Sequence, residues 1–427
     1  KLCYTIRVNN RTIAQYASRG SGKGIGRILV LTGARETGKK TLSRHLFPSH
    51  TYVSIEDPVM RGDYARLTAA QWNLLYPHAI LDEVQKQPSL IESIKSVYDQ
   101  FPEPTYILLG SSQFLLLEKV KESLAGRCRI IELYPLTLPE LESSGWDEAV
   151  QPSLFQQCLL DPSSTQEVVD SFLPSFNLDP LMAKRDRAWR HYIRYGGYPA
   201  LTDIDMSDRD RYEWLAMYVK TYLERDIRDL AEFRDLDPFV RMQRYLAQQT
   251  GRTVNASAIS QEVGVSVKTV QKYLNYFELS YQTIMLPSWE RNMNKRLTKS
   301  PKLHFLDNGV LQAVLRKQGG VTGHEFESLM VAEMFKQIKC LPLPTSPYHL
   351  RTHDGKKVDL LLETNEGYFA FEIKMSDHSV ASDAKHLRSV EAILDKPLLH
   401  AFLLSNDPVT RTLGDGITAV NATYFLT

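Results

Sequence analysis

The sequence has few cysteines and no long apolar segment. Its four cysteines, Cys3, Cys128, Cys158 and Cys340, form no C-x-x-C pair and no closely spaced framework. Scattered cysteines of this kind favour free, buried thiols in a reducing compartment. No apolar run approaches the length of about eighteen residues that a membrane-spanning helix needs, and the start of the chain lacks the charged-then-apolar pattern of a secretion signal. We therefore expect a cytoplasmic protein that does not insert into a membrane.

Net charge is also nearly absent. The 427 residues include 51 Lys and Arg against 50 Asp and Glu, which gives a formal charge of +1. A nucleic-acid partner would therefore be bound by a local basic patch rather than by the overall field of the molecule. A content of 43% hydrophobic and 24% charged residues is typical of a globular protein. The length predicts about two to four domains.

A phosphate-binding pattern lies near the N-terminus. The stretch LTGARETGKKTL places Gly33, Gly38 and Lys39 where the pattern G-x-x-x-x-G-K-[ST] requires them. A β-branched apolar run at 27–33 precedes the loop, and a helical pattern at 39–47 follows it. In a strand, loop and helix of this order, backbone N–H groups point at the phosphates and Lys39 reaches the terminal ones. The sequence therefore predicts an ATP site.

One position departs from the pattern. Lys40 stands where a hydroxyl group that binds Mg²⁺ belongs, and Thr41 comes one residue late. A Mg²⁺ ion that bridges the β and γ phosphates takes a lone pair from that hydroxyl, whereas an ammonium group offers none and repels the metal. Thr41 can replace the hydroxyl only if the loop shifts. We expect ATP binding to survive and Mg²⁺-dependent hydrolysis to be weakened.

An acidic pair follows at the end of a second apolar run. The stretch HAILDEVQ places Asp82 and Glu83 at the exposed tip of an expected core strand. Two carboxylates at such a position are costly unless they have a partner. Asp82 can hold Mg²⁺ through water, and Glu83 can orient the attacking water. The pair therefore supports the prediction of an ATP site.

Three further runs complete the predicted N-terminal domain. Residues 51–57, 105–110 and 128–134 are apolar and, with the two runs above, predict a five-stranded parallel sheet with helices between its strands. Ser111 and Ser112 directly follow one of these strands, where a hydroxyl can sense the terminal phosphate. The alternative is an α/β domain without nucleotide whose loop only resembles the pattern.

These motifs together resemble a known group of proteins. LTGARETGKKTL, ILDEVQKQPSLIESIK, LLGSSQFLLL, ESLAGR, IELYPLTLPEL and, later, YGGYPAL are similar to the predicted AAA-like, STAND-related P-loop ATPases of bacteria and archaea that carry a C-terminal domain of unknown function. The resemblance extends from about residue 25 to about residue 405. It implies that Lys39 contacts the phosphates, that Asp82 binds magnesium and that Glu83 is the catalytic acid. Ser111 or Ser112 would be the sensor.

The resemblance also implies a role for Arg127 and marks two departures. Arg127, in the stretch LAGR, would be an arginine near the nucleotide, although a structural ion pair or a helix C-cap explains it equally well. Members of the group usually have Gly-Lys-Thr-Thr in the loop, where this chain has Lys40, and a proline where it has Ala34. An arginine that acts in trans would require a homo-oligomer.

The middle of the chain predicts helices. Residues 146–235 are first rich in Ser, Pro, Gln and Asp and then show helical apolar spacing, which predicts a helical lid or connector. Within residues 236–318, Gly264 and Ser266 separate two expected helices, which predicts a helix-turn-helix. The apolar strands that follow suggest a winged form.

DNA is the macromolecular partner that this region suggests. The second helix would have Val267, Val270 and Leu274 on its apolar face. It would expose three polar side chains, Lys268, Gln271 and Lys272. The stretch WERNMNKRLTKSPK has five basic residues against one acid, so the pattern is compatible with DNA contact through residues 266–302. The alternative is a lid or interaction module, because fold similarity does not establish function.

The last part of the chain contains a second group of acids. In GKKVDLLLETNEGYFAFEIKMS, Asp359 opens an apolar strand, a turn follows at 365–367, and the returning strand places Glu372 and Lys374 on one face. This arrangement is that of the PD-(D/E)xK nucleases, in which the acids hold magnesium and the lysine helps to activate water.

Two neighbouring residues bear on this prediction. Glu327, on the apolar helix before these strands, resembles the additional acid that such folds place beside the metal. The family pattern usually has an acid where this chain has Lys357. The alternative is an inherited nuclease-like domain whose charged cluster is a satisfied ion-pair network.

The sequence thus predicts an α/β protein with four parts. These are a P-loop parallel-sheet domain at 1–145, a helical lid at 146–235, a winged helix at 236–318 and a nuclease-like α/β domain at 319–427. The leading function is an ATPase, with ATP and Mg²⁺ as cofactors, whose nucleotide state controls the later domains. The first alternative is a metal-dependent DNA nuclease with a regulatory or degenerate ATP site. The second is a non-catalytic interaction protein.

Overall fold

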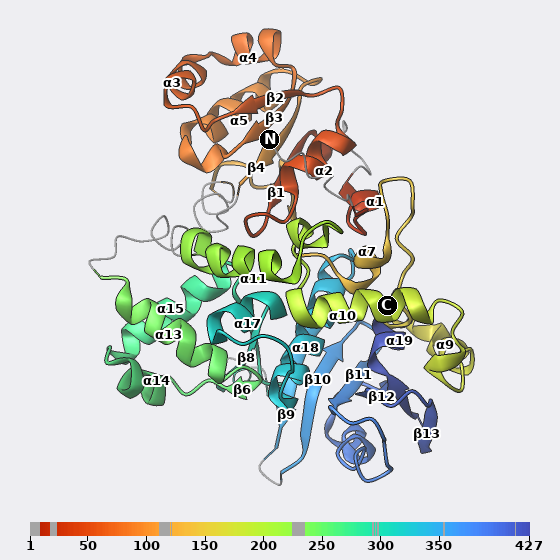
Figure 1. Cartoon of the computed structure of the whole chain (residues 1–427). Helices are drawn as coiled ribbons and strands as arrows, with labels where there is room; N and C mark the ends of the chain where they lie inside the picture. The colour runs from red at the N-terminus through yellow and green to blue at the C-terminus, as the bar shows by residue number, and fades with distance from the viewer. Residues whose placement is uncertain are drawn as a thin grey trace.

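The structure of the chain, a computed structural model, has an N-terminal lobe that stands on a larger body (Figure 1). The middle and C-terminal parts of the chain build that body together. The structure describes residues 9–17, 24–110, 120, 122–223, 235–292, 294, 296, 299–352, 355–414 and 416–427. Ser111 and Ser112 of the predicted ATP site lie outside these residues.

The N-terminal lobe is built on a five-stranded parallel sheet. Its strands are β1 (Ile28–Thr32), β2 (Thr51–Ser54), β3 (His78–Asp82), β4 (Thr105–Leu109) and β5 (Cys128–Glu132), in the order β2-β3-β4-β1-β5. The lobe's helices are α1 (Ala14–Ala17), α2 (Lys39–Leu46), α3 (Pro58–Arg66), α4 (Ala69–Leu75) and α5 (Ser89–Gln100), whereas α7 (Leu138–Glu142) follows β5 and packs against α10 (Met182–Tyr195) in the larger body. Because side chains alternate along a strand, Ile28 and Val30 pack in one apolar cluster and Leu29 and Leu31 in another. This sheet and its order confirm the predicted fold class.

The middle part is mostly helical, as the sequence predicts. It contains α8 (Leu154–Leu160), α9 (Thr165–Asp170), α10 (Met182–Tyr195), α11 (Asp208–Met217), α13 (Asp237–Gln248), α14 (Ala256–Val263), α15 (Val267–Leu279) and α17 (Asn308–Leu315). A small antiparallel sheet accompanies them, with β6 (Arg252–Thr253), β7 (Thr283–Leu286) and β8 (Lys302–Phe305) in the order β6-β8-β7.

The turn between α14 and α15 has the expected chemistry. Gly264 ends α14 with a left-handed φ of 75°, and the side chain of Ser266 accepts a hydrogen bond from Thr269 N at the start of α15. Val270 is fully buried, as expected. Val267 was expected on the apolar face but is 40% exposed. It is the first residue of α15, one turn before the fully buried Val270.

The C-terminal part is a six-stranded mixed sheet with one long buried helix. The elements are α18 (Gly323–Lys339), β9 (Ser346–Arg351), β10 (Lys357–Glu363), β11 (Tyr368–Ile373), β12 (Leu398–Ser405), β13 (Arg411–Gly414), β14 (Ile417–Asn421) and α19 (Ala422–Leu426), with strand order β13-β14-β12-β11-β10-β9. The predicted hairpin is present, since β10 and β11 pair antiparallel. Phe369 and Phe371 face the core that contains α18, whereas Tyr368 and Ala370 face the other side of the sheet. Among the described residues, no helix combines the length and apolar character needed to cross a bilayer.

Candidate functional site

The phosphate loop joins the end of β1 to the start of α2. Gly33 has a φ of 145°, and a Cβ atom there would collide with the carbonyl oxygen of Leu133. Gly38 has a left-handed φ of 88° and directly precedes α2. Both positions therefore favour glycine for backbone reasons, which the spacing alone could not show.

The lysine of the loop lies against the loop itself. Lys39 Nζ donates hydrogen bonds to the carbonyl oxygens of Gly33, at 2.9 Å, and of Ala34, at 2.6 Å. The hydroxyl of Thr37 donates to the same Ala34 oxygen at 2.9 Å and so braces the turn. The ammonium group thus spans the loop where the N-terminus of α2 adds positive potential, which is a suitable place for a phosphate group.

Lys40 is turned toward an aromatic ring. Its ammonium nitrogen lies 4.3 Å from the centre of the Tyr52 ring, and the Tyr52 hydroxyl donates a hydrogen bond to Asp82 Oδ2. Burial and the hydrogen bond to Asp82 raise the pKa of Tyr52, so this hydroxyl stays a donor. Thr41 is exposed one position further along α2. The loop therefore presents no hydroxyl at the position of Lys40.

Glu83 and Arg127 have partners of their own. Glu83 has a left-handed φ of 59°, and its Oε2 accepts a hydrogen bond of 2.6 Å from Gln85 Nε2. Arg127 Nε donates to Asp99 Oδ1 at 2.9 Å, at the end of α5. Arg127 thus forms the kind of structural ion pair that the sequence left as one alternative, and its role near a nucleotide stays a prediction.

A segment of the middle part lies beside the phosphate loop. Pro199 Cγ is 4.0 Å from the position that a Cβ atom of Gly38 would occupy. The Tyr218 hydroxyl lies 3.3 Å from the carbonyl oxygen of Arg35, to which it donates, and 3.0 Å from the Tyr198 hydroxyl. In the sequence, the stretch YGGYPAL supported only the family resemblance and was not predicted to be part of the site. The signal was available, since two glycines and a proline directly after a helix indicate a fixed turn.

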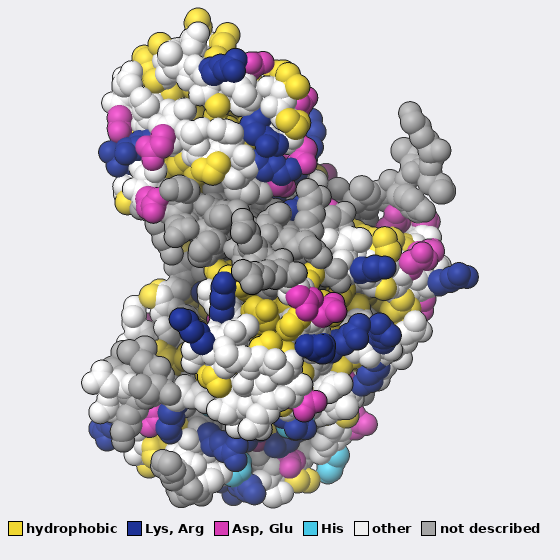
Figure 2. Space-filling model, turned by 90° about the vertical axis from the view of Figure 1, so that its left-hand side faces the viewer, with side chains coloured by type: hydrophobic (Ala, Val, Ile, Leu, Met, Phe, Trp, Pro, Cys, Tyr) yellow, Lys and Arg dark blue, Asp and Glu magenta, His cyan; other side chains and the backbone are white. Residues whose placement is uncertain are grey.

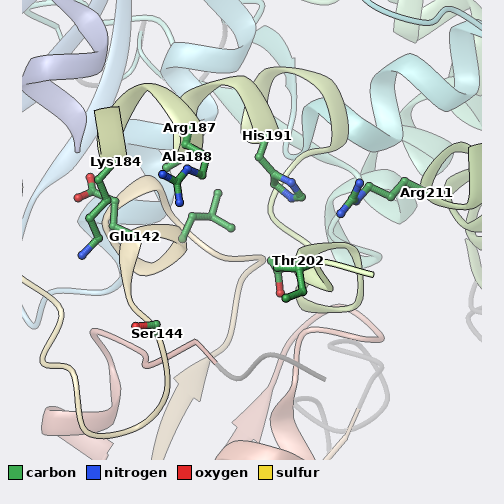
Figure 3. A pocket seen from close by; sticks show the side chains of 10 residues that line it. Glu142, Ser144, Lys184, Arg187, Ala188, His191, Thr202 and Arg211 are labelled. Atoms are coloured by element: carbon green, nitrogen blue, oxygen red, sulfur yellow. The ribbon is translucent and has the colours of Figure 1, made fainter. Parts of the chain in front are cut away.

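A cavity of about 600 Å³ opens next to this segment (Figure 3). Its walls come from α7, α10, α11 and the short helix Pro199–Thr202. Lys184 pairs with Glu148 at 2.6 Å, and Arg211 donates to the Leu201 carbonyl at 2.9 Å. Lys184 and Arg211 are thus engaged by the protein, and Arg187 also lines the cavity.

The acidic side chains of the C-terminal part form ion pairs with lysines. Lys302 contacts Glu327 Oε1 and lies 3.4 Å from Asp359 Oδ1. Lys357 lies 2.7 Å from Asp359 Oδ1 and 3.8 Å from Glu327 Oε2. The predicted Glu372 and Lys374 do approach each other, with 2.7 Å between Glu372 Oε1 and Lys374 Nζ.

The electrostatics of this cluster follow from burial. Burial and the nearby Asp359 raise the pKa of Glu327 to about 6 and that of Glu372 to about 7. Burial alone would raise the pKa of Asp359 as well, but the ammonium groups of Lys302 and Lys357 lower it below its ordinary value. Asp359 is therefore the fixed negative charge of the group.

The predicted DNA surface is only partly basic. Lys268, Gln271 and Lys272 are exposed on α15, as expected. In the stretch 289–302, however, Arg296 pairs with Glu363, Lys299 with Glu290 and Lys302 with Glu327. These three side chains were expected to face a partner but serve as internal counter-ions, and Lys295 lies outside the described residues. On the side of the molecule that carries α15, Figure 2 shows basic side chains scattered among acidic and apolar ones.

The phosphate loop and the five-stranded parallel sheet that carries it have the fold of a P-loop ATPase domain. Residues 26–142 match the family described as AAA domain. Residues 186–319 and 322–425 match two families described as domains of unknown function, DUF8612 and DUF4143.

Two curated relatives resemble this chain over different lengths. An uncharacterized protein of Mycobacterium tuberculosis is 26% identical over 413 residues, which cover 94% of this chain and 81% of that protein. An uncharacterized protein of Haemophilus influenzae is 22% identical over 263 residues, 60% of this chain and 57% of that protein.

Two solved structures show distant similarity. The Walker-type ATPase of Pyrococcus abyssi has 12% identity and a TM-score of 0.43, and the match covers 74% of this chain and 99% of that chain. A STAND protein with a tetratricopeptide repeat sensor from Pyrococcus horikoshii has 11% identity and a TM-score of 0.28, with 79% and 46% covered. Similarity this weak says nothing about what the present chain does.

Proposed function

We propose that the chain binds ATP at the phosphate loop, hydrolyses it slowly, and passes its nucleotide state to the middle and C-terminal parts. The observation that carries this proposal is the position of Lys39, whose ammonium group spans a loop of correct spacing at the start of α2. Slow turnover follows from Lys40, which occupies the hydroxyl position and provides no lone pair for a metal.

Each residue of the site has a separate role. Lys39 exchanges its contacts with the Gly33 and Ala34 carbonyls for the β and γ phosphates, and the N–H groups at the start of α2 bind the same oxygens. Asp82 is the carboxylate that would hold Mg²⁺, and Glu83 would orient the attacking water. Magnesium, when bound, supplies positive charge that stabilises the phosphates. Ser111 and Ser112 keep their predicted sensor role.

The path to the rest of the chain begins at the loop. Tyr218 donates to the Arg35 carbonyl, so a shift of the loop alters a contact with the middle part. From Tyr198 and Pro199 the chain leads back to Gly197, whose N–H donates to Asp307 Oδ2 at 2.8 Å. Asp307 caps α17 through Val310 N. Loop, segment and helix therefore form one connected element that ATP binding can bias.

Two adjacent lysines provide the test. We would measure ATP binding by calorimetry, with and without Mg²⁺, for wild type, Lys39→Ala and Lys40→Ala. The proposal expects Lys39→Ala to abolish binding, whereas Lys40→Ala should keep it within about threefold, because Lys40 points to Tyr52. Equal loss in both variants, or no binding by wild type, would contradict the proposal.

DNA contact through α15 is a second proposal, and it concerns the winged helix expected at 236–318. Lys268, Gln271, Lys272 and Asn275 are exposed at helical spacing, so they share one face of α15. Fluorescence anisotropy with duplex DNA at several salt concentrations tests it. Lys268→Ala with Lys272→Ala should lower the slope of log K against log salt by about 2. An unchanged slope would exclude this face.

A further inference from the structure

The acid cluster of the C-terminal part already contains a cation from another part of the chain. Lys302 begins β8 of the small middle sheet, while Glu327 lies on α18 and Asp359 on β10. These elements lie side by side in the body of the molecule (Figure 1). The Lys302 side chain is 8% exposed, Glu327 6% and Asp359 1%. A lysine so deeply buried requires close carboxylate partners, because an unpaired charge there is strongly unfavourable.

A second ammonium group completes the neutralisation. Lys357 Nζ lies within 4 Å of both carboxylates, at 2.7 Å from Asp359 Oδ1 and 3.8 Å from Glu327 Oε2. The remaining oxygen, Asp359 Oδ2, accepts the N–H of Ile373 at 3.0 Å. All four oxygens of Glu327 and Asp359 thus have a partner within the protein. Two positive charges face two negative ones.

This arrangement does not fit a divalent metal ion. Mg²⁺ needs several oxygen lone pairs that point to one place. Here Glu327 Oε1 and both oxygens of Asp359 accept hydrogen bonds from N–H donors, and Glu327 Oε2 faces the Lys357 ammonium group at 3.8 Å. Within this cluster, only Glu372 Oε2 is buried without a hydrogen bond, and one such oxygen is too few for Mg²⁺. In the part of the chain that the structure describes, no three His, Cys, Asp or Glu side chains are grouped so that they could hold a metal. The sequence expectation of a magnesium site at Glu327, Asp359 and Glu372 is therefore at odds with the lysines around it.

We infer that Lys302, assisted by Lys357, is the resident cation of this cluster in place of a metal, and that it fastens the middle sheet to the C-terminal sheet. Within the cluster, only Lys302 comes from the middle sheet and so connects it to the C-terminal sheet. Lys357 lies on β10, the same strand as Asp359, and is 40% exposed. As long as β8 packs against α18, the cation position is filled. Metal-dependent cleavage at Asp359 is then not expected of the chain in this arrangement.

Metal binding by the full-length, nucleotide-free protein tests the first half of the inference. Mn²⁺ would be titrated and followed by electron paramagnetic resonance for wild type, Asp359→Asn, and Lys302→Met with Lys357→Met. We expect no Mn²⁺ site in wild type that depends on Asp359, and one new site per chain in the double variant, which a further Asp359→Asn change removes. An Asp359-dependent site in wild type, or no new site in a folded double variant, would overturn the inference.

Thermal unfolding tests the second half and covers variants that fold poorly. Lys299→Met is the matched control, because Lys299 belongs to the same stretch but pairs with Glu290 and is 33% exposed. Lys302→Met should lower the melting temperature by roughly 5–10 °C and Lys299→Met by about 2 °C or less. Adding Glu327→Gln to Lys302→Met should recover part of the loss, because it removes the uncompensated charge. Equal effects of the two lysine variants would overturn the role of Lys302 as a fastening residue.

Discussion

The backbone N–H of Gly197 donates a hydrogen bond of 2.8 Å to Asp307 Oδ2, although the two residues are 110 positions apart. The packing around this bond leaves no space for side chains, since a Cβ atom at Gly196 would collide with the Asp307 carboxylate and one at Gly309 with the Tyr195 carbonyl. Leu136 N, just after β5, donates to the Gly197 carbonyl at 2.6 Å. One short turn therefore joins the segment after β5 of the N-terminal lobe to α17.

Asp307→Ala should be costly for this reason. The change removes the N-cap of α17 and leaves Gly197 N–H buried without its acceptor, so we expect a loss of about 2–4 kcal/mol in the free energy of unfolding. Asn255→Ala is the matched control, because Asn255 caps α14 but its bond to Ala258 N is exposed. That variant should lose about 1 kcal/mol. Urea unfolding measures both, and equal losses would show that Asp307 acts only as a cap.

Lys40→Thr should increase ATP turnover. The change restores a hydroxyl at the expected metal position and removes a positive charge, so kcat should rise about tenfold or more. Steady-state phosphate release measures it, with Thr41→Ala as the control that should leave turnover unchanged. If turnover does not change while ATP still binds, Lys40 is not what limits hydrolysis.

The sequence predicted the phosphate-loop fold well because its signals are local. The run before Gly33, the helical spacing after Lys39 and the acids at the end of β3 each specify a short element. Parallel pairing follows from the alternation of strands and helices. Gly264 and Ser266 specify the turn before α15 in the same local way.

The pairing of charges could not be predicted in this way. In the sequence, Lys302 and Arg296 have the pattern of surface residues in a basic stretch. In the structure, β8 and the segment before it pack on the C-terminal sheet, where Lys302 and Arg296 form ion pairs with carboxylates that are distant in the sequence. The same limit applies to Asp307, whose partner Gly197 is recognisable only when the two parts are packed together. Long-range partners of polar groups depend on tertiary packing, which motif spacing does not contain.

Acid should destabilise the C-terminal sheet through His400. Burial lowers the pKa of this histidine to about 4, from 6.5 when unfolded, and its Nε2 lies 2.9 Å from the Thr418 hydroxyl. Below about pH 6.5, His400 is protonated in the unfolded chain but stays neutral in the folded chain. The free energy of unfolding therefore falls as the pH drops toward about 4, by up to about 3 kcal/mol. Urea unfolding across this range should show a smaller fall for His400→Gln. Burial also lowers the pKa of His349 to about 4, so the His400→Gln variant should still lose some stability as the pH drops.

Glu333 and Lys336 form a fully buried ion pair that holds α18 to the segment after β5. Their charged groups are 3.3 Å apart, Glu333 Oε1 accepts Leu138 N at 2.7 Å, and Lys336 Nζ donates to the Leu136 carbonyl at 3.1 Å. Lys336→Met alone leaves an uncompensated carboxylate and should cost about 3–5 kcal/mol.

Adding Glu333→Gln to Lys336→Met should then recover much of that cost, because glutamine keeps an acceptor for Leu138 N without a charge. A double-mutant cycle by urea unfolding should give a coupling energy of about 2 kcal/mol or more. The exposed pair Arg190 and Asp186 on α10 is the comparison, and its coupling should stay below about 1 kcal/mol. Additive losses for Glu333 and Lys336 would show that the two residues hold the interface independently, each through its bond to the segment after β5.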